Sequence, residues 1–200
     1  GLYMPEHYYA TGGDVNKATS SNMDTPIFAV ARDRKKDLKE FLRLAIDLDL
    51  KQARAFWTVA LEKAEPWICI YSGQPIYQGT YSLDHFLPWR YVAHDLLWNI
   101  IPTPKSVNSS KNDNLPDLSR YFERFAGIQY RAMQAVARSS KAVLLEDYAL
   151  LLKLDSIAGL QAIPLAQFSE KLRDVISPQV QIAANMGFPA QWVYGLTTVN

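Results

Sequence analysis

Apolar side chains recur every three or four residues along much of the chain, which is the spacing that places them on one face of a helix. The pattern appears first over residues 37–48 and again over residues 53–61, and it stops before Pro66. Its apolar members are Leu38, Phe41, Leu42, Ala45, Leu48, Ala53, Phe56, Trp57, Ala60 and Leu61. We therefore predict a helical region over residues 27–65 with two helices. These two helices could pack against each other as a helical hairpin.

Three further helical patterns lie in residues 117–200, the predicted C-terminal helical region. They run from Leu118 to Ser139, from Ala142 to Leu154 and from Leu165 to Met186. The last pattern is expected to break near Ser177-Pro178, because proline removes an intrahelical donor and disfavours helix in the residue before it. The sequence shows no internal repeat.

A different pattern, typical of strands, separates these helical regions. Over residues 67–87, aromatic and β-branched residues alternate with turn signals at Ser72-Gly73, Pro75 and Gly79. This is the only segment in which the sequence predicts β-structure. Residues 1–26 are rich in Gly, Ser, Thr, Asn and Tyr without a period, and we expect an N-terminal arm or loop there. The predicted fold is mainly α with a small β-ribbon.

The composition indicates a globular protein. A chain of 200 residues with 48% hydrophobic and 20% charged content is enough for one substantial core, or for a small catalytic module with a helical companion. Its apolar runs are too short to span a bilayer, and residues 1–14 lack a basic segment followed by an apolar stretch. The single cysteine, Cys69, can form no intramolecular disulfide. We therefore expect a cytoplasmic protein that does not contact a membrane.

The formal net charge of +1 does not indicate nucleic-acid binding, because phosphate affinity arises from clusters of Lys and Arg rather than from the total. One cluster follows a single stripe of the pattern at 118–139 and consists of Arg120, Arg124, Arg131 and Arg138. This stripe is either a solvent-exposed face with no binding role or a surface that binds DNA phosphates. A second cluster, Arg32, Arg34, Lys35 and Lys36, is interleaved with acidic residues and is interpreted as surface charge.

The stretch from Ser82 to Pro116 carries the residues with the most specific chemistry. Asp84 and His85 are adjacent, Asn99 lies fourteen residues after His85, and Asn108 lies nine residues further on. Two serines then precede Lys111. Because neighbouring residues of a strand point to opposite faces, a turn at Pro88 has to bring Asp84 and His85 towards one substrate.

This D-H, N, N-x-x-K order resembles the HNH, or His-Me finger, endonuclease family. The resemblance extends from Cys69 to Pro116 and is closest to the zinc-free HNH domains of RNA-guided CRISPR effector nucleases. It implies a ββα-metal motif over residues 66–116. It also implies hydrolysis of DNA phosphodiester bonds to a 5′ phosphate and a 3′ hydroxyl, with one strand cut per active site.

The resemblance implies a role for each motif residue. Asp84 and Asn108 would hold one Mg²⁺ or Mn²⁺ ion through hard oxygen ligands. His85 would be the general base that takes a proton from the attacking water. Asn99 would position the loop beside His85, and Lys111 would neutralise a phosphate as a point charge. The candidate DNA contacts are Lys105, Lys111, Arg120, Arg124, Arg131 and Arg138.

One departure from the family pattern concerns structural zinc. Many members hold zinc with four cysteines, and the corresponding positions here are Cys69, Ser72, Pro104 and Val107. One thiolate cannot hold a structural zinc ion, so none is expected. Aromatic packing would take its place. The residues expected to supply it are Trp67, Tyr71, Tyr81, Phe86, Trp89 and Trp98.

Other residues with reactive side chains have simpler interpretations. His94, beside Asp95, is interpreted as a surface residue or a helix-cap neighbour, and His7 is given no role. Cys69 is interpreted as a small buried hydrophobe.

The resemblance suggests a part in bacterial defence, as a restriction-type, CRISPR-associated or other anti-phage nuclease. Its partners would be duplex DNA or a displaced strand, and other subunits of a larger defence complex. Two alternatives stay open. One is a catalytically silent HNH-like module that binds nucleic acid or a protein, and the other is an RNA-directed or toxin nuclease.

Overall fold

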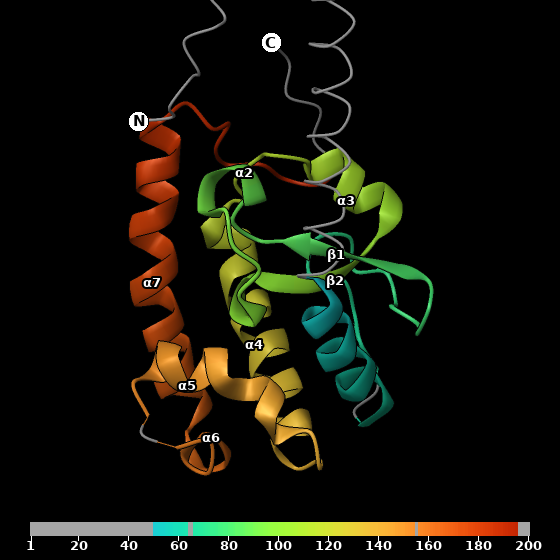
Figure 1. Cartoon of the computed structure of the whole chain (residues 1–200). Coiled ribbons are helices and arrows are strands. Elements are labelled where there is room, and N and C mark those ends of the chain that lie inside the picture. Colours follow the sequence, from blue (N-terminus) through green and yellow to red (C-terminus); the bar gives the residue numbers. More distant parts are fainter. Residues whose placement is uncertain (1–49, 64–65, 155, 196–200) are drawn as a thin grey trace, which may run out of the picture. The chain divides into compact units, whose positions relative to one another are not determined.

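The structure is a computed structural model that describes residues 50–63, 66–154 and 156–195 (Figure 1). The predicted arm over residues 1–26, the helix over 37–48 and the basic cluster at residues 32–36 lie outside the described residues, as does His7. Residues 50–63 are helical, which confirms the helix predicted from the apolar pattern at 53–61.

The described part of the chain is mainly helical and contains one two-stranded antiparallel sheet packed against helices (Figure 1). The elements are β1 (Tyr81–His85), α2 (Trp89–Val92), η3 (Leu97–Asn99), β2 (Ile100–Pro104), α3 (Lys105–Lys111), α4 (Leu118–Ala137), η4 (Ala142–Leu145), α5 (Glu146–Leu152), α6 (Gly159–Ala162) and α7 (Leu165–Asn185). This arrangement confirms the predicted fold class, and the sequence of β1, β2 and α3 is consistent with a ββα motif.

The register of the ribbon sets the position of the two adjacent motif residues. In the antiparallel pairing, Asp84 lies opposite Ile101 and His85 lies opposite Ile100. Helix α3 begins at the residue that follows β2 and contacts both strands. The last residues of β1 therefore lie beside the second half of α3, where Asn108 and Lys111 contact residues 83–85.

The prediction that residues 67–87 contain all the β-structure is wrong, because β2 lies outside that segment. Pro102 and Pro104 are two of the five residues of β2, and proline cannot donate to a strand ladder. In a two-stranded ribbon each strand has one edge without a β partner, so a proline can direct its missing donor there. Residues 67–87 contribute β1 and one isolated bridge between Ile68 and Pro75.

Helix α4 packs against the residue that follows β1. It begins at Asp117, whose side chain accepts hydrogen bonds from the backbone N–H groups of Ser119 and Arg120 and so caps the helix. The ring of Phe86, which follows β1, stacks on Phe125 of α4 with 3.9 Å between the ring centroids. The predicted apolar face of α4 is buried; its members include Tyr121, Phe122, Phe125, Ile128 and Val136.

The aromatic residues that were expected to replace a structural zinc ion are mostly buried, as are two of the four corresponding positions. Cys69 and Val107 are buried, and the rings of Trp57 and Trp67 meet edge to face at 5.7 Å. Of the six aromatic residues predicted to supply packing, four are buried and Tyr81 and Trp89 are half-buried. The four are Trp67, Tyr71, Phe86 and Trp98.

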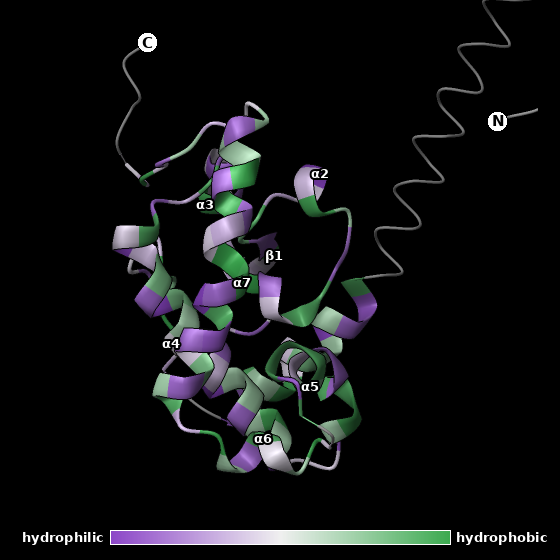
Figure 2. Cartoon of the chain, turned by 90° about the vertical axis from the view of Figure 1, so that its left-hand side faces the viewer, coloured by the Kyte–Doolittle hydropathy of each residue, from purple (hydrophilic) through white to green (hydrophobic). Residues whose placement is uncertain are grey.

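The predicted break near Ser177-Pro178 is wrong, because α7 runs without interruption from Leu165 to Asn185 and contains Pro178. Pro178 is exposed, whereas Leu172 and Ile176 on the other face are buried and α7 packs on α4. Tertiary packing thus holds the helix together despite the lost hydrogen bond. Figure 2 shows hydrophilic and hydrophobic stretches alternating along these helices, as expected for helices with one buried face.

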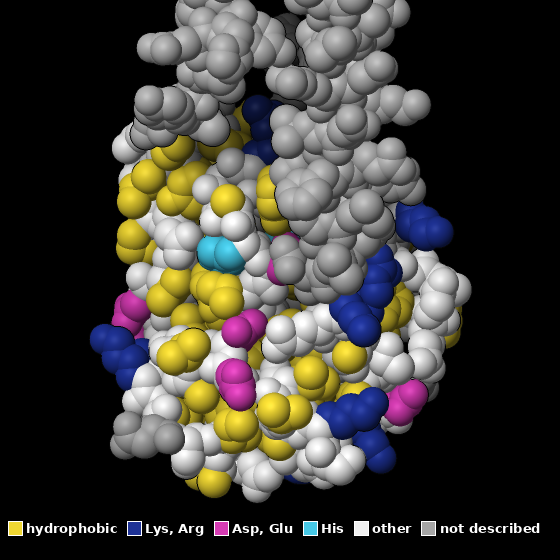
Figure 3. Space-filling model, in the orientation of Figure 1, with side chains coloured by type: hydrophobic (Ala, Val, Ile, Leu, Met, Phe, Trp, Pro, Cys, Tyr) yellow, Lys and Arg dark blue, Asp and Glu magenta, His cyan; other side chains and the backbone are white. Residues whose placement is uncertain are grey.

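The arginine stripe of α4 is exposed along its whole length, as the spacing of Arg120, Arg124, Arg131 and Arg138 predicts. On the face shown in Figure 3, Lys and Arg side chains lie in separate spots among apolar and acidic ones.

None of the described helices combines the length and the apolar composition needed to cross a bilayer.

Candidate active site

A pocket of about 300 Å³ opens where the end of β1 meets α2 and α3. Three residues of the D-H, N, N-x-x-K pattern line it, namely Asp84, His85 and Asn108. The other lining residues are Leu83, Pro88, Trp89, Ser109, Asn112 and Asp113. The fold thus brings together side chains that are more than twenty residues apart in the chain.

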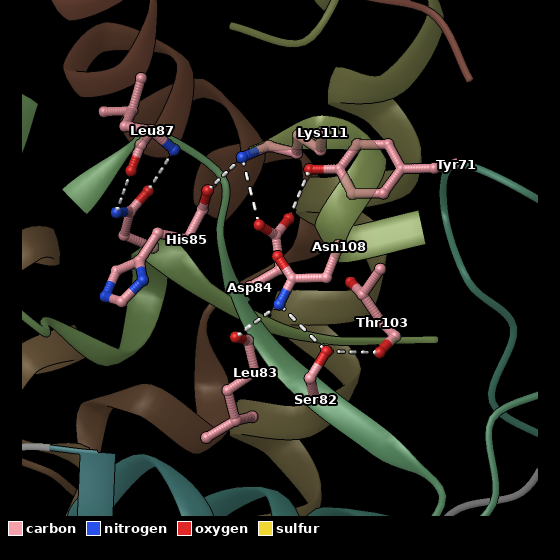
Figure 4. A network of polar contacts seen from close by, with 10 residues as sticks. Tyr71, Ser82, Leu83, Asp84, His85, Leu87, Thr103, Asn108 and Lys111 are labelled. Carbon is pink, nitrogen blue, oxygen red and sulfur yellow. Dashed lines mark hydrogen bonds and ion pairs between the residues drawn. The ribbon is translucent and has the colours of Figure 1, made fainter. Parts of the chain in front are cut away.

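The carboxylate of Asp84 is held by two donors (Figure 4). Its Oδ1 accepts a hydrogen bond from Nζ of Lys111 at 3.2 Å, and its Oδ2 accepts one from the hydroxyl of Tyr71 at 3.1 Å. The side chain is 3% exposed. Burial raises the pKa of Asp84, while Lys111 and Tyr71 act in the opposite direction. Each oxygen accepts one bond and keeps a further lone pair for a ligand.

Tyr71 is a donor that sequence reasoning did not assign to the site. Burial, and then the neighbouring Asp84 carboxylate, raise the pKa of Tyr71 well above its ordinary value. The hydroxyl therefore stays protonated at neutral pH and donates to Asp84. The sequence showed Tyr71 only as one of several aromatic residues, and nothing in its spacing indicated a contact thirteen residues away with Asp84.

Lys111 is completely buried, with 0% of its side chain exposed. Its ammonium donates to Asp84 and also to the backbone carbonyl of His85, at 2.6 Å. The structure therefore places Lys111 beneath the Asp84-His85 pair, and it is not among the residues that line the pocket. Its predicted contact with a phosphate would require the side chain to leave this position.

Asn108 presents its amide oxygen as a free acceptor. The amide nitrogen donates to the hydroxyl of Ser82 at 3.0 Å and to the carbonyl of Leu83 at 3.2 Å (Figure 4). Because a carbonyl can only accept, these contacts determine which end of the amide faces β1. Among the described residues, no group donates a hydrogen bond to the side-chain oxygen of Asn108, Oδ1.

The imidazole of His85 lines the same pocket and also contacts a residue outside it. Its Nε2 lies 2.6 Å from Oδ1 of Asp95. Figure 4 shows the His85 ring and the Asp84 carboxylate leaving β1 in different directions, as adjacent strand residues do. Sequence reasoning missed Asp95, which it noted only as the neighbour of His94. His94 itself is half-buried, and its ring meets that of Trp98 at 5.7 Å.

Asn99 is fully buried and holds the chain segment that follows His85. Its side-chain oxygen accepts from the N–H of Leu87 at 2.8 Å, and its amide nitrogen donates to the carbonyl of Leu87 at 3.0 Å. Its backbone carbonyl accepts from the N–H of Phe86 at 2.8 Å. Asn99 thus lies beside the loop that continues from the histidine, and its positioning role stays a prediction.

The oxygen atoms at the pocket are suited to a divalent cation. A carboxylate from Asp84 and an amide oxygen from Asn108 are hard ligands, and magnesium is commonly held by one or two protein carboxylates with water and phosphate oxygens. Among the residues that the structure describes, no group of three or more His, Cys, Asp or Glu side chains is placed to hold a metal. The Asp84 carboxylate and the Asn108 amide oxygen suit an ion that keeps several water ligands.

The predicted DNA contacts divide into two kinds. Arg124 donates to the carbonyl of Ile70 at 3.4 Å, and Arg131 donates to the carbonyl of Pro66 at 3.1 Å while its guanidinium lies 4.6 Å from the centre of the Trp67 ring. These two arginines therefore help to fasten residues 66–70 to α4. Lys105, Arg120 and Arg138 are exposed and make no side-chain hydrogen bond within the described part of the chain.

Comparison with known proteins identifies one family. Residues 69–117 match the model of the HNH endonuclease family, whose members cleave nucleic acids and typically use a divalent metal ion. The matched segment contains the whole ribbon, α3 and all the residues that line the pocket. No curated protein and no solved structure matches the chain significantly.

Proposed function

We propose that the chain uses the HNH endonuclease domain at residues 69–117 to hydrolyse phosphodiester bonds in DNA with the help of a divalent metal ion. The observation that supports this most directly is the pocket in which Asp84, His85 and Asn108 lie together. A carboxylate, an amide oxygen and an imidazole at one opening are the groups needed to hold a cation and to accept a proton.

Asp84 and Asn108 would hold the ion, for which Mg²⁺ or Mn²⁺ is suited. When bound, such an ion supplies positive charge that stabilises the leaving 3′ oxygen and the phosphate. The hydrogen bonds from Lys111 and Tyr71 keep the Asp84 carboxylate in a single orientation. The contacts of the Asn108 amide with Ser82 and Leu83 do the same for its oxygen.

His85 would act as the general base. In this step the imidazole takes one proton from a water molecule as the water oxygen forms a bond to phosphorus, and the bond from phosphorus to the 3′ oxygen breaks. The two hydrogen bonds between Asn99 and Leu87 hold the loop after His85 and so limit movement of the histidine. Lys111 would contribute by supporting both Asp84 and the His85 carbonyl.

A role in bacterial defence is the cellular function that we propose. It is supported by the likeness of the motif to the HNH domains of RNA-guided effector nucleases. The chain would act on foreign DNA as a restriction-type, CRISPR-associated or other anti-phage nuclease, alone or with other subunits of a defence complex. In this setting it would work in the cytoplasm.

Replacing Asn108 by alanine tests the proposed metal ligand. With supercoiled plasmid as substrate, we expect cleavage by the wild-type chain in Mg²⁺ and none in EDTA. Asn108→Ala should raise the Mg²⁺ concentration that gives half-maximal cleavage at least about tenfold, because an ion ligand is lost. Ser110→Ala is the matched control, since Ser110 is exposed on the same helix and does not line the pocket. An unchanged Mg²⁺ dependence in Asn108→Ala would contradict the assignment.

The same assay, extended to other substrates, separates the alternatives. If supercoiled plasmid survives in every lane while the chain still shifts DNA in a gel, the domain is a silent binding module. If RNA is cut and duplex DNA is not, the chain is an RNA-directed nuclease, and the proposed substrate is wrong. Parallel digestion of RNA, single-stranded DNA and duplex DNA therefore gives a distinct result for each case.

The exposed arginines offer a separate prediction about DNA binding. The double replacement of Arg120 and Arg138 by alanine should weaken binding to all DNA sequences alike, since these side chains are free to contact phosphates. We expect the slope of log affinity against log salt concentration to fall by about 1 for each arginine that contacts a phosphate. Lys141→Ala, which removes another exposed cation, is the control. Equal salt slopes in the double variant and the control would show that the stripe is only a solvated face.

A further inference from the structure

The pair formed by His85 and Asp95 is the closest contact that a pocket residue makes with a side chain outside the pocket. Nε2 of His85 and Oδ1 of Asp95 are 2.6 Å apart, and the two side chains are 12% and 6% exposed. The second oxygen of Asp95 is buried, and among the described residues no group donates to it. The imidazole is therefore the one described side-chain partner of this buried carboxylate.

We propose that Asp95 is a positioning residue that acts through His85 and determines which of its ring nitrogens serves as the base. This inference rests on the proposed nuclease function and adds a residue to it. Asp95 does not line the pocket, so it would touch neither substrate nor metal ion.

The chemistry of the pair selects the atom that accepts the proton. An ionised carboxylate can only accept hydrogen bonds, so the hydrogen between the two groups is carried by Nε2 of His85. A neutral imidazole has a single N–H, and the lone pair is then on Nδ1. Nδ1 is thus the atom that takes the proton from water. The bond through Nε2 also restricts rotation of the ring about its bond to the backbone, which keeps Nδ1 in one direction.

The position of Asp95 is determined by the fold around it. On one side, Ala93 caps the C-terminal end of α2 in a left-handed conformation with φ of 52°. On the other side, the N–H of Leu97 donates to the carboxylate of Asp147 in the first turn of α5 at 2.9 Å, and Leu97 is buried. The loop that carries Asp95 is therefore anchored to α5 by a contact between residues that are fifty positions apart in the chain. Asp95 can hold the imidazole because its own backbone is held.

The first test compares single-turnover cleavage by Asp95→Ala, Asp95→Asn, His85→Ala and the double variant His85→Ala/Asp95→Ala. We expect Asp95→Ala to lower the cleavage rate by about 10–100-fold at saturating DNA and Mg²⁺, with little change in the affinity for either. Asp95→Asn keeps the shape and an acceptor oxygen, so it should cleave at a rate between those of Asp95→Ala and the wild type. Asp174→Ala, which removes an exposed carboxylate of α7, should cleave at the wild-type rate.

The double variant shows whether Asp95 acts through His85. When the imidazole is already missing, removing Asp95 should cause no further loss, because residues that act as a unit are not additive. An equal loss from Asp95→Ala in both backgrounds would overturn the inference. So would a wild-type cleavage rate in Asp95→Ala while His85→Ala is inactive. If His85→Ala itself cleaves normally, the proposed base is wrong, and the proposed function has failed at that step rather than the role of Asp95.

A spectroscopic measurement keeps the inference testable even if a variant folds poorly. In the proton NMR spectrum of the wild-type chain, the Nε2 hydrogen of His85 should resonate far downfield and exchange slowly, because it is shared with a carboxylate and nearly buried. The signal should persist in Asp174→Ala and disappear in His85→Ala. Its absence from the wild-type spectrum would overturn the inference without any measurement of activity.

Discussion

His85→Ala is expected to lower the rate of DNA cleavage by about two to four orders of magnitude while leaving Mg²⁺ binding unchanged. The reason is that the imidazole, which lines the pocket, is the proposed proton acceptor, whereas Asp84 and Asn108 carry the proposed metal ligands. Single-turnover cleavage of a labelled duplex gives the rate, and calorimetric titration with Mg²⁺ gives the affinity. Because the replacement also leaves the buried Asp95 carboxylate without its partner, both measurements belong at a temperature well below the unfolding midpoint.

His94→Ala is the matched control for this prediction. His94 is half-buried, and burial is the main reason why its pKa is lowered, so it is neutral at physiological pH. Its ring packs against Trp98 and does not line the pocket. We expect His94→Ala to cleave at close to the wild-type rate. If the His85 variant cleaves within about threefold of the wild-type rate, which is far from the loss expected of a missing base, another group accepts the proton.

Asp84→Ala is expected to cause the largest loss of stability of any replacement at the site, about 3–5 kcal/mol in the free energy of unfolding. It removes the carboxylate from a fully buried ammonium and leaves the charge of Lys111 with the His85 carbonyl as its remaining described partner. Chemical denaturation at neutral pH measures the loss. Arg90→Ala is the control, because it breaks an ion pair with Asp113 whose arginine is 74% exposed. Such an exposed pair contributes less than about 1 kcal/mol.

Combining Asp84→Ala with Lys111→Met separates stability from chemistry. Once the buried ammonium is replaced by an apolar side chain, much of the lost stability should return, because an apolar pair avoids the cost of burying an uncompensated charge. Cleavage should not return, since the proposed carboxylate ligand is still missing. Additive losses of stability in the double variant would show that Asp84 and Lys111 do not depend on each other. Restored cleavage would show that Asp84 is not needed at the pocket.

Local patterns were sufficient to predict the two long helices α4 and α7 and to locate the segment that carries the motif. The apolar spacing of residues 118–139 and 165–186 predicted α4 and α7 to within a few residues, because that spacing is a property of each segment alone. The order of Asp84, His85, Asn99 and Asn108 identified the segment that the family comparison also matches. In both cases the information lies within one short stretch of the chain.

The failures have a common cause, which is that tertiary contacts outweighed local preference. Prolines argue against a strand at residues 100–104 and against a continuous helix at Pro178. The structure accommodates them because β2 has only one partner strand, and because the buried face of α7 packs on α4 while Pro178 lies on the exposed side. Neither the number of strands nor the packing of a helix face is visible in the residues beside a proline.

The sequence by itself determined which residues we propose for the chemistry, because a carboxylate, an imidazole and an amide in a particular order are readable without a fold. Only the tertiary structure decided how they are held. Tyr71 reaches Asp84 from a loop before β1, Lys111 reaches it from the end of α3, and Asp95 reaches His85 from a loop anchored on α5. These contacts depend on how distant segments meet in three dimensions, and a hydrogen bond requires that two atoms lie within about 3 Å of each other wherever their residues fall in the chain.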